Sequence, residues 1–169
     1  VAKKTGRELV LWNGACMVHE IFSQQRILKL KNRHPEAKFI AHPECEDSIL
    51  KMADYIGSTT GLLKYTINNQ AKEFIVATES GIIHQMEKAM PEKNFIGAPG
   101  ADGNCNCNIC PYMALNTLEK IYLCLRDLTP RIEIDEELRL AAKKSLDRMI
   151  DMAAGTVGQG DLGARFGIA

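Results

Sequence analysis

The sequence predicts an α/β fold, a parallel-sheet αβα sandwich unit followed by C-terminal helices. Short apolar runs rich in β-branched residues alternate with segments of helical period, which is typical of parallel strands joined by crossover helices. After residue 104 the strand pattern stops and only helical periodicity remains. The length of 169 residues is enough for one such unit with a core of normal size.

Each apolar run is assigned in chain order to a strand, and each gap between the runs to a helix. The predicted strands are residues 8–12 (ELVLW), 38–42 (KFIAH), 73–78 (EFIVAT) and 94–99 (NFIGAP). The predicted helices are residues 17–32, 46–56, 59–68, 80–90, 111–127 and 135–154. Most units end near Gly, Asn or Pro, as crossover connections require.

The last two predicted helices each carry one apolar face. Pro111 suits a first helical position, and Asp135 suits an N-cap. Cys124 lies between two leucines and is predicted to be a core residue. The apolar faces need a partner surface, either the α/β unit or residues outside this chain.

Charge and composition narrow the class of partner. Lys plus Arg equal Asp plus Glu at 21 each, so no nucleic acid and no membrane partner is expected, and a small molecule is favoured. No apolar run reaches about 18 residues and no leader pattern is present, so we expect a cytoplasmic location. Six cysteines in such a sequence indicate thiols, metal ligands or redox groups rather than a disulfide scaffold.

The loops that follow the strands carry the chemically active residues. In a parallel sheet, ligands bind beyond the carboxyl ends of the strands, so these loops are expected to meet at one edge. The residues expected there are Cys16, His19, His42 and Glu44, together with Cys105, Cys107 or Cys110.

Cys16 and His19 belong to the first of these loops. Cys16 follows Gly14 and Ala15 at a predicted helix start, where free N–H groups stabilise a thiolate. The alternative is a small buried hydrophobe at a strand-to-helix corner. His19, three residues on, is able to reach the same site, although an isolated histidine is more often a packing residue.

Two further segments combine bases, acids and hydroxyls. Pro43 fixes the backbone between His42 and Glu44, which suits them to proton transfer. A structural alternative is equally open, with His42 ending a strand and Glu44 favouring a helix N-terminus. Ser58 and Thr59 precede a helix, where they either hold a carboxylate or phosphate or act as ordinary caps.

The Cys105, Cys107 and Cys110 group is the densest local signal. Its C-x-C-x-x-C spacing matches neither paired zinc knuckles nor the bacterial ferredoxin run, so a metal here needs ligands from elsewhere. Cys16 and Cys110 are then the natural pair, with Cys105 and Cys107 forming a redox pair or having no role. The competing functional class is a noncatalytic zinc-binding or thiol redox module that uses all three clustered cysteines.

Five motifs in fixed order carry a family resemblance. They are LWNGACMVHEIF, HPEC, GSTTGLL, FIVATESGIIHQM and CNCNICPYMALNTLEKIY. Over about residues 8–154 the chain resembles the carboxyl-terminal half of the quinolinate synthase A family. The resemblance implies a [4Fe-4S] cluster on three cysteines, one from each of three pseudo-symmetry-related α/β units. Cys16 matches the second ligand and Cys110 the third, and Cys105 with Cys107 matches a variable accessory pair.

The resemblance also implies an activity. The family is a transferase of NAD biosynthesis that condenses iminoaspartate with dihydroxyacetone phosphate to quinolinate, and an L-aspartate oxidase or dehydrogenase is the expected supplier of iminoaspartate. An iron without a protein ligand acts as the Lewis acid. His42, Pro43 and Glu44 match a segment that contacts the dicarboxylate, with Glu44 as acid/base. Thr59, with Ser58 beside it, matches a carboxylate contact, and His19 an active-site histidine.

The resemblance divides the chain into four parts. Residues 1–15 are expected to end a preceding, truncated α/β unit, and 16–104 to form an α/β unit. Residues 105–154 are expected to hold the cluster-ligand loop and C-terminal helices, and the Gly-rich residues 155–169 to be a disordered tail. The family half with the first cluster cysteine has no match in this chain, so we expect a quinolinate synthase fragment with two of three ligands.

Overall fold

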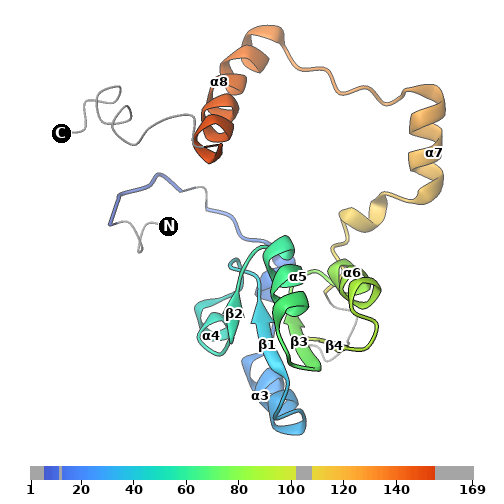
Figure 1. The fold of residues 1–169 in the computed structure, drawn as a ribbon. Helices are drawn as coiled ribbons and strands as arrows, with labels where there is room; N and C mark the ends of the chain where they lie inside the picture. The colour runs from blue at the N-terminus through green and yellow to red at the C-terminus, as the bar shows by residue number, and fades with distance from the viewer. Residues whose placement is uncertain (1–5, 12, 102–107, 155–169) are drawn as a thin grey trace. The chain divides into compact units, whose positions relative to one another are not determined.

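A computed structural model describes residues 6–11, 13–101 and 108–154 (Figure 1). The chain divides into two compact units, one ending at Thr117 and one beginning at Leu118. The first contains the sheet and the second two helices, and each is described by itself.

The first unit is built on a parallel sheet. Its strands are β1 (Lys38–Ala41), β2 (Tyr55–Ile56), β3 (Glu73–Ala77) and β4 (Asn94–Gly97), in the order β2-β1-β3-β4. Ala41 lies opposite Ala77, and Val76 lies opposite Gly97. The residues that follow β1, β3 and β4 therefore leave the sheet at one edge, its carboxyl edge.

Helices cover both faces of the sheet (Figure 1). They are α3 (Gln24–Arg33) and α4 (Asp47–Leu50) on one face, and α5 (Thr59–Asn68) and α6 (Gly81–Ala89) on the other. Alternate strand residues point to opposite faces, so Phe39 and Ile75 pack with α3 and α4 while Ile40 and Phe74 pack with α5 and α6. The predicted αβα sandwich is confirmed.

The predicted helix 17–32 is wrong as a single element. It divides into α2 (Met17–Glu20) and α3, because residues 21–23 pair with the segment after β4. Ser23 N donates to Pro99 O over 3.1 Å, and Ala101 N donates to Ile21 O over 3.0 Å. This pairing fixes α2 beside the carboxyl edge of the sheet.

Two other predicted boundaries are also wrong. The described residues 8–11 form no strand, and Val10 and Leu11 are exposed, since no neighbouring strand lies beside them to supply hydrogen bonds. The predicted helix 46–56 ends at Leu50 in α4, and Tyr55–Ile56 form the short strand β2 instead. Pairing with β1 overrides the helical spacing of this segment.

The predicted helix 111–127 is interrupted as well. A 3₁₀ turn, η1 (Met113–Leu115), comes first, and α7 (Leu118–Asp127) begins only after Asn116. Asn116 leaves the helical conformation while its N–H still bonds to Met113 O, as a turn residue does. The helix α8 (Glu136–Ala153) has the predicted cap, because Asp135 Oδ1 accepts from Leu138 N over 3.1 Å.

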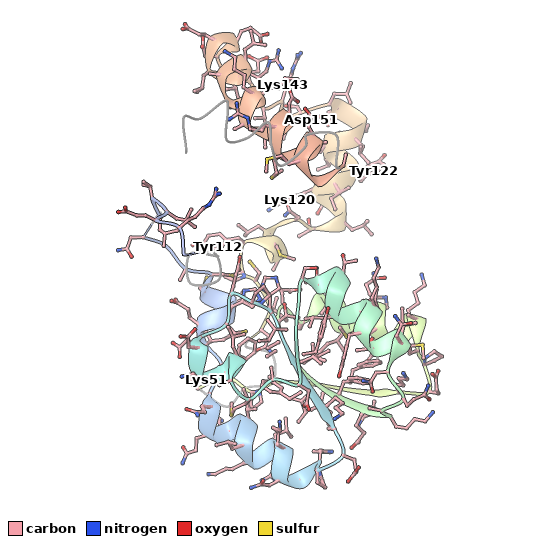
Figure 2. The ribbon with its side chains drawn as sticks, turned by 60° about the vertical axis from the view of Figure 1, so that its left-hand side comes forward. Lys51, Tyr112, Lys120, Tyr122, Lys143 and Asp151 are labelled. Atoms are coloured by element: carbon pink, nitrogen blue, oxygen red, sulfur yellow. The ribbon has the colours of Figure 1, made fainter. Side chains whose placement is uncertain are left out.

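The side chains of α7 and α8 are exposed, among them Tyr122 and Lys143, which project outward from their helices (Figure 2). Cys124 is exposed too, so its predicted core position is wrong in this structure, because none of the described residues of the second unit covers it. No helix within the described part of the chain is both long and apolar enough for a membrane crossing.

Candidate active site at the carboxyl edge of the sheet

His19 is the buried centre of a polar cluster. Its Nδ1 lies 3.1 Å from Glu44 Oε2, and its Nε2 lies 3.1 Å from Thr78 Oγ1. His19 comes from α2, Glu44 from the turn after β1 and Thr78 from the end of β3. The side chain of His19 is 8% exposed and that of Glu44 is 57% exposed, so the histidine is held while the carboxylate faces solvent.

His42 stacks on His19. The ring centroids are 4.3 Å apart and the rings are nearly parallel, at 10°. The backbone N of His42 donates to Ala77 O over 3.0 Å, which continues the β1–β3 ladder by one residue. Burial first, and then the nearby His19, lower the pKa of His42, while Glu44 opposes this shift. The imidazole of His42 is therefore neutral near pH 7, the form that accepts a proton.

The turn that holds Glu44 is short and constrained. Cys45 N donates to His42 O over 3.0 Å, and Glu44 N donates to His42 Nδ1 over 3.4 Å. The exposed Pro43 fixes φ between the two functional residues. This arrangement sets the carboxylate of Glu44 3.9 Å from His42 Nδ1, so one acid lies within reach of both imidazoles.

Cys16 is the N-cap residue of α2 and lies in the same cluster. Its Sγ, a ligand nitrogen of His19 and a carboxylate oxygen of Glu44 all lie within 4.8 Å of one another. A pocket of about 540 Å³ opens beside them, lined by Gly14, Ala15, Cys16 and Glu44. The structure thus brings together four of the residues that the sequence analysis expected at one edge: Cys16, His19, His42 and Glu44.

Cys45 lies nearby but has a different character. It is buried, and its Sγ donates to Ala77 O over 3.5 Å. Burial is the main cause that raises the pKa of this thiol to about 11. Cys45 therefore stays protonated at neutral pH and is a core residue rather than a thiolate ligand.

Cys110 follows a residue that is anchored at the carboxyl edge, beside the ends of β3 and β4. Asn108, fully buried, donates from its side-chain Nδ2 to Ala98 O over 2.9 Å, and its backbone carbonyl accepts from Ser80 N over 3.1 Å. Ala98 and Ser80 follow β4 and β3, so Asn108 is anchored at the carboxyl edge. Cys110 is half-buried and two residues on, within about 7 Å along the chain. Cys105 and Cys107 lie outside the described residues.

Ser58 and Thr59 follow β2 at the same edge. Ser58 Oγ accepts from Gly61 N over 3.2 Å and caps α5, which is the capping alternative of the sequence analysis. Thr59 is exposed in the first turn of α5. Their predicted contact with a substrate stays a prediction.

Sequence reasoning missed two residues, Thr78 and Asn108. Thr78 ends the predicted strand 73–78, and its polar side chain after four apolar residues was an available signal. Asn108 lies between Cys107 and Cys110 in the sequence, and no sequence pattern marks it as buried.

Comparisons with known proteins show which family the chain belongs to. The family model described as Quinolinate synthetase A protein matches residues 1–151. A quinolinate synthase of Synechococcus sp. is 60% identical over 154 residues, covering 91% of this chain and 48% of that protein. Its counterpart from Microcystis aeruginosa is 61% identical over 153 residues, with 90% and 48% covered.

A more distant relative gives the same result. The quinolinate synthase of Chloroherpeton thalassium is 53% identical over 151 residues, covering 89% of this chain and 47% of that protein. The chain thus spans about half the length of the curated relatives it matches. Because the family model covers the whole first unit, α7 and almost all of α8, this chain belongs to the quinolinate synthetase A protein family.

Proposed function

We propose that the chain is the carboxyl-terminal half of a quinolinate synthase, which condenses iminoaspartate with dihydroxyacetone phosphate in NAD biosynthesis. The observation that carries the proposal is the convergence of His19, His42 and Glu44 beside the thiol of Cys16. Two imidazoles in contact with a carboxylate that lines a pocket suit the proton transfers that an imine condensation and dehydration require.

The proposed cofactor is a [4Fe-4S] cluster held by Cys16 and Cys110, with a third ligand from the other half of the protein. Both thiols are free and half-buried, which fits thiolate ligation, whereas the buried and protonated Cys45 does not fit. When bound, the cluster supplies an iron without a protein ligand that serves as a Lewis acid.

The chain's own residues are assigned the remaining roles. Neutral His42 accepts a proton from the substrate, and Glu44, oriented by His19, acts as the acid/base that faces the pocket. Pro43 keeps His42 and Glu44 at a fixed separation. The hydroxyls of Ser58 and Thr59, at the start of α5, are proposed to bind a substrate carboxylate.

Two contextual proposals accompany this function. Iminoaspartate is unstable in water, so we propose an L-aspartate oxidase or dehydrogenase as its supplier. The described cysteines are free thiols, which a reducing compartment maintains, so we propose a cytoplasmic location. Cell fractionation with an antibody to this chain tests the location.

Anaerobic reconstitution tests the cluster. The chain is combined with the amino-terminal half of the Synechococcus relative, and iron and sulfide are added. We expect brown cluster absorption and quinolinate formation, both lost in Cys16→Ser and in Cys110→Ser and both kept in Cys105→Ser. Cys124→Ser is the matched control, since Cys124 is an exposed thiol of the second unit.

The opposite pattern favours the competing function. If Cys105 is indispensable and Cys16 is dispensable, the chain is the noncatalytic zinc-binding or thiol redox module that uses Cys105, Cys107 and Cys110. Zinc content and disulfide mapping of the same variants then distinguish the metal form from the redox form.

A further inference from the structure

A pocket of about 450 Å³ lies between α3 and the edge strand β4. We propose that this pocket binds a small organic phosphate with the size and charge of a nucleoside diphosphate. Small-molecule sites in proteins have volumes of about 300–1,000 Å³, so the pocket is large enough for such a ligand. The inference goes beyond the proposed function, because the residues that line this pocket are not among those assigned to the active site.

Three cations of α3 line the pocket: Arg26, Lys29 and Arg33. They are three and then four residues apart, so they lie on one face of the helix, along about 10 Å of its length. Among the described residues, no Asp or Glu lines the pocket. A ligand in this position therefore meets three positive charges and no negative charge.

A cation on another side of α3 shows the contrast. Lys31 Nζ lies 3.8 Å from Asp54 Oδ2, so its charge has an acidic partner. In the described part of the chain, Arg26, Lys29 and Arg33 form no ion pair with an acid. The positive charge on the pocket side of α3 is thus uncompensated by those residues, and this charge favours an anionic ligand.

Part of the pocket lining is apolar. Leu30, Ile96 and Pro99 lie beside the three cations. Leu30 and Ile96 also pack against the core cluster under α3, which holds them in place. An inorganic anion gains nothing from such a surface, whereas the ring of an organic phosphate buries apolar area against it. The combination of charges and apolar surface therefore favours an organic phosphate over a free anion.

β4 adds a backbone donor to the pocket. Ala98 N donates to Val76 O over 2.9 Å, so the backbone groups of Ala98 point toward β3. Successive residues of a strand point their N–H groups to opposite sides. Gly97, which lines the pocket, therefore directs its N–H to the outer side of β4, and β4 is the last strand in the sheet order. A phosphate oxygen is a suitable acceptor for this N–H.

The pocket also joins two segments whose pairing places α2. α3 begins directly after Ser23, and Ser23 N donates to Pro99 O over 3.1 Å. A ligand held by α3 on one side and by Gly97 and Pro99 on the other ties these segments together. Because such a ligand binds the folded state, it is expected to stabilise the first unit against unfolding.

Three probes separate the contributions of charge and ring. ADP carries both, inorganic pyrophosphate carries only the charge, and adenosine carries only the ring. The full chain is titrated by calorimetry in buffer without divalent cations. We expect one ADP per chain, bound at least about tenfold more tightly than pyrophosphate, and no binding of adenosine at the same concentration. Saturating ADP is expected to raise the melting temperature of the first unit.

Single substitutions identify the cations. Lys29→Gln and Arg33→Gln each remove one charge from an exposed side chain, so the fold is expected to be kept. Each is expected to raise the dissociation constant of ADP about tenfold, because one charge-assisted hydrogen bond is lost. Lys88→Gln changes an exposed lysine of α6, on the other face of the sheet, and is the matched control that leaves binding unchanged.

Amide resonances of the nitrogen-15-labelled chain locate the bound ligand. The N–H of Gly97 is expected to shift when ADP is added. Gly61, in the first turn of α5, is the reference for binding at the proposed substrate-carboxylate site, and its N–H is expected to stay unshifted. This measurement separates the pocket from the active site without any assay of activity.

Four results overturn the proposal. They are the absence of ADP binding, equal affinities for ADP and pyrophosphate, equal effects of Arg33→Gln and Lys88→Gln, and a shift of Gly61 N–H without a shift of Gly97 N–H. The titration is then repeated with the chain combined with the amino-terminal half of the Synechococcus relative. Loss of ADP binding there would make the pocket an interface between the two halves, which also overturns the proposal. Failure to form quinolinate leaves all of these measurements intact.

Discussion

The two units of the chain use apolar residues in opposite ways. In the first unit the strands and helices bury Phe39, Ile75 and Phe74 completely. In the second unit large apolar side chains are exposed, including Leu118 at 84% and Leu125 at 72%. The first unit therefore contains its own core, whereas α7 and α8 have helical patterns without a covered face.

This difference separates helix formation from helix packing. Asp135 caps α8, and Lys143 pairs with Asp147 four residues on, so local interactions define the helix. Most helical stability in proteins comes from packing of an apolar face, and the described residues of the second unit supply no such cover to α7 or α8. The comparison implies that the first unit carries the stability of the chain.

Substitution of a large apolar residue in each unit tests this contrast most strongly. Phe39→Ala is expected to lower the free energy of unfolding by about 3–5 kcal/mol, because it leaves a cavity under α3 and α4. Leu125→Ala changes an exposed side chain and is expected to stay within about 0.5 kcal/mol. Urea unfolding of the full chain measures both. Equal losses would mean that α7 is covered in solution.

Thiol reactivity tests the same contrast at two cysteines. Cys45 in the first unit has a pKa of about 11, so at pH 8 only about one thiol in a thousand is ionised. Cys124 in the second unit is exposed. We expect iodoacetamide to label Cys124 at least about 100-fold faster than Cys45, followed by peptide mass spectrometry. Comparable rates would show that the first unit opens readily.

In each unit an aspartate side chain accepts a hydrogen bond from a backbone N–H, so its removal allows the two units to be compared. Asp54 Oδ2 accepts from Phe39 N over 2.8 Å, with Lys31 and Lys38 beside it, so Asp54→Ala is expected to cost the first unit about 2 kcal/mol. Asp135→Ala removes only the cap of α8, worth about 1 kcal/mol of helix formation. Circular dichroism should show lower helicity for Asp135→Ala with an unchanged melting temperature for the first unit.

A surface carboxylate gives the smallest expected effect. Hydrogen bonds from Asn94 and then His34 lower the pKa of Glu73 below its ordinary value of 4.5. The stabilisation of the folded state that this lower pKa implies is present above about pH 4.5. It is lost as the pH falls through the folded-state pKa, because the unfolded chain then binds more protons. Glu73→Gln should flatten the fall of stability in acid, measured by thermal unfolding, while the exposed Glu36→Gln should not.

The sequence predicted the sheet well where a strand is a continuous apolar run that lies between two helical segments. β1, β3 and β4 lie inside the predicted runs, because fully buried parallel strands are continuous apolar stretches. It failed at β2, whose two residues pair only because β1 lies beside them. It also failed at residues 21–23, where pairing with Pro99 and Ala101 divides a helical pattern. Both failures are tertiary effects on short segments.

The candidate site was predicted in its members but not in its contacts. His42 and Glu44 were expected there because they follow β1, and strand ends meet at one edge of a parallel sheet. Cys16 and His19 were expected there because they follow the predicted strand 8–12, which the structure does not contain in its described residues. That His19 is the buried centre, with Thr78 on its other side, depends on the position of α2. Since α2 is placed by contacts with the segment after β4, no local pattern reveals this arrangement.

The register of β1 against β3 has a consequence for how this family tolerates change. Ala41 lies opposite Ala77, so His42 and Thr78 follow at the same level of the sheet. With the start of β3 fixed, deletion of one residue within the strand would present the carboxylate of Glu79 to His19 in place of the hydroxyl, and insertion would present the methyl group of Ala77. Either change would also turn the core side chains that follow it in the strand to the opposite face. Length changes inside this strand are therefore expected to be eliminated by selection, whereas the turns on the opposite edge of the sheet are free to vary in length.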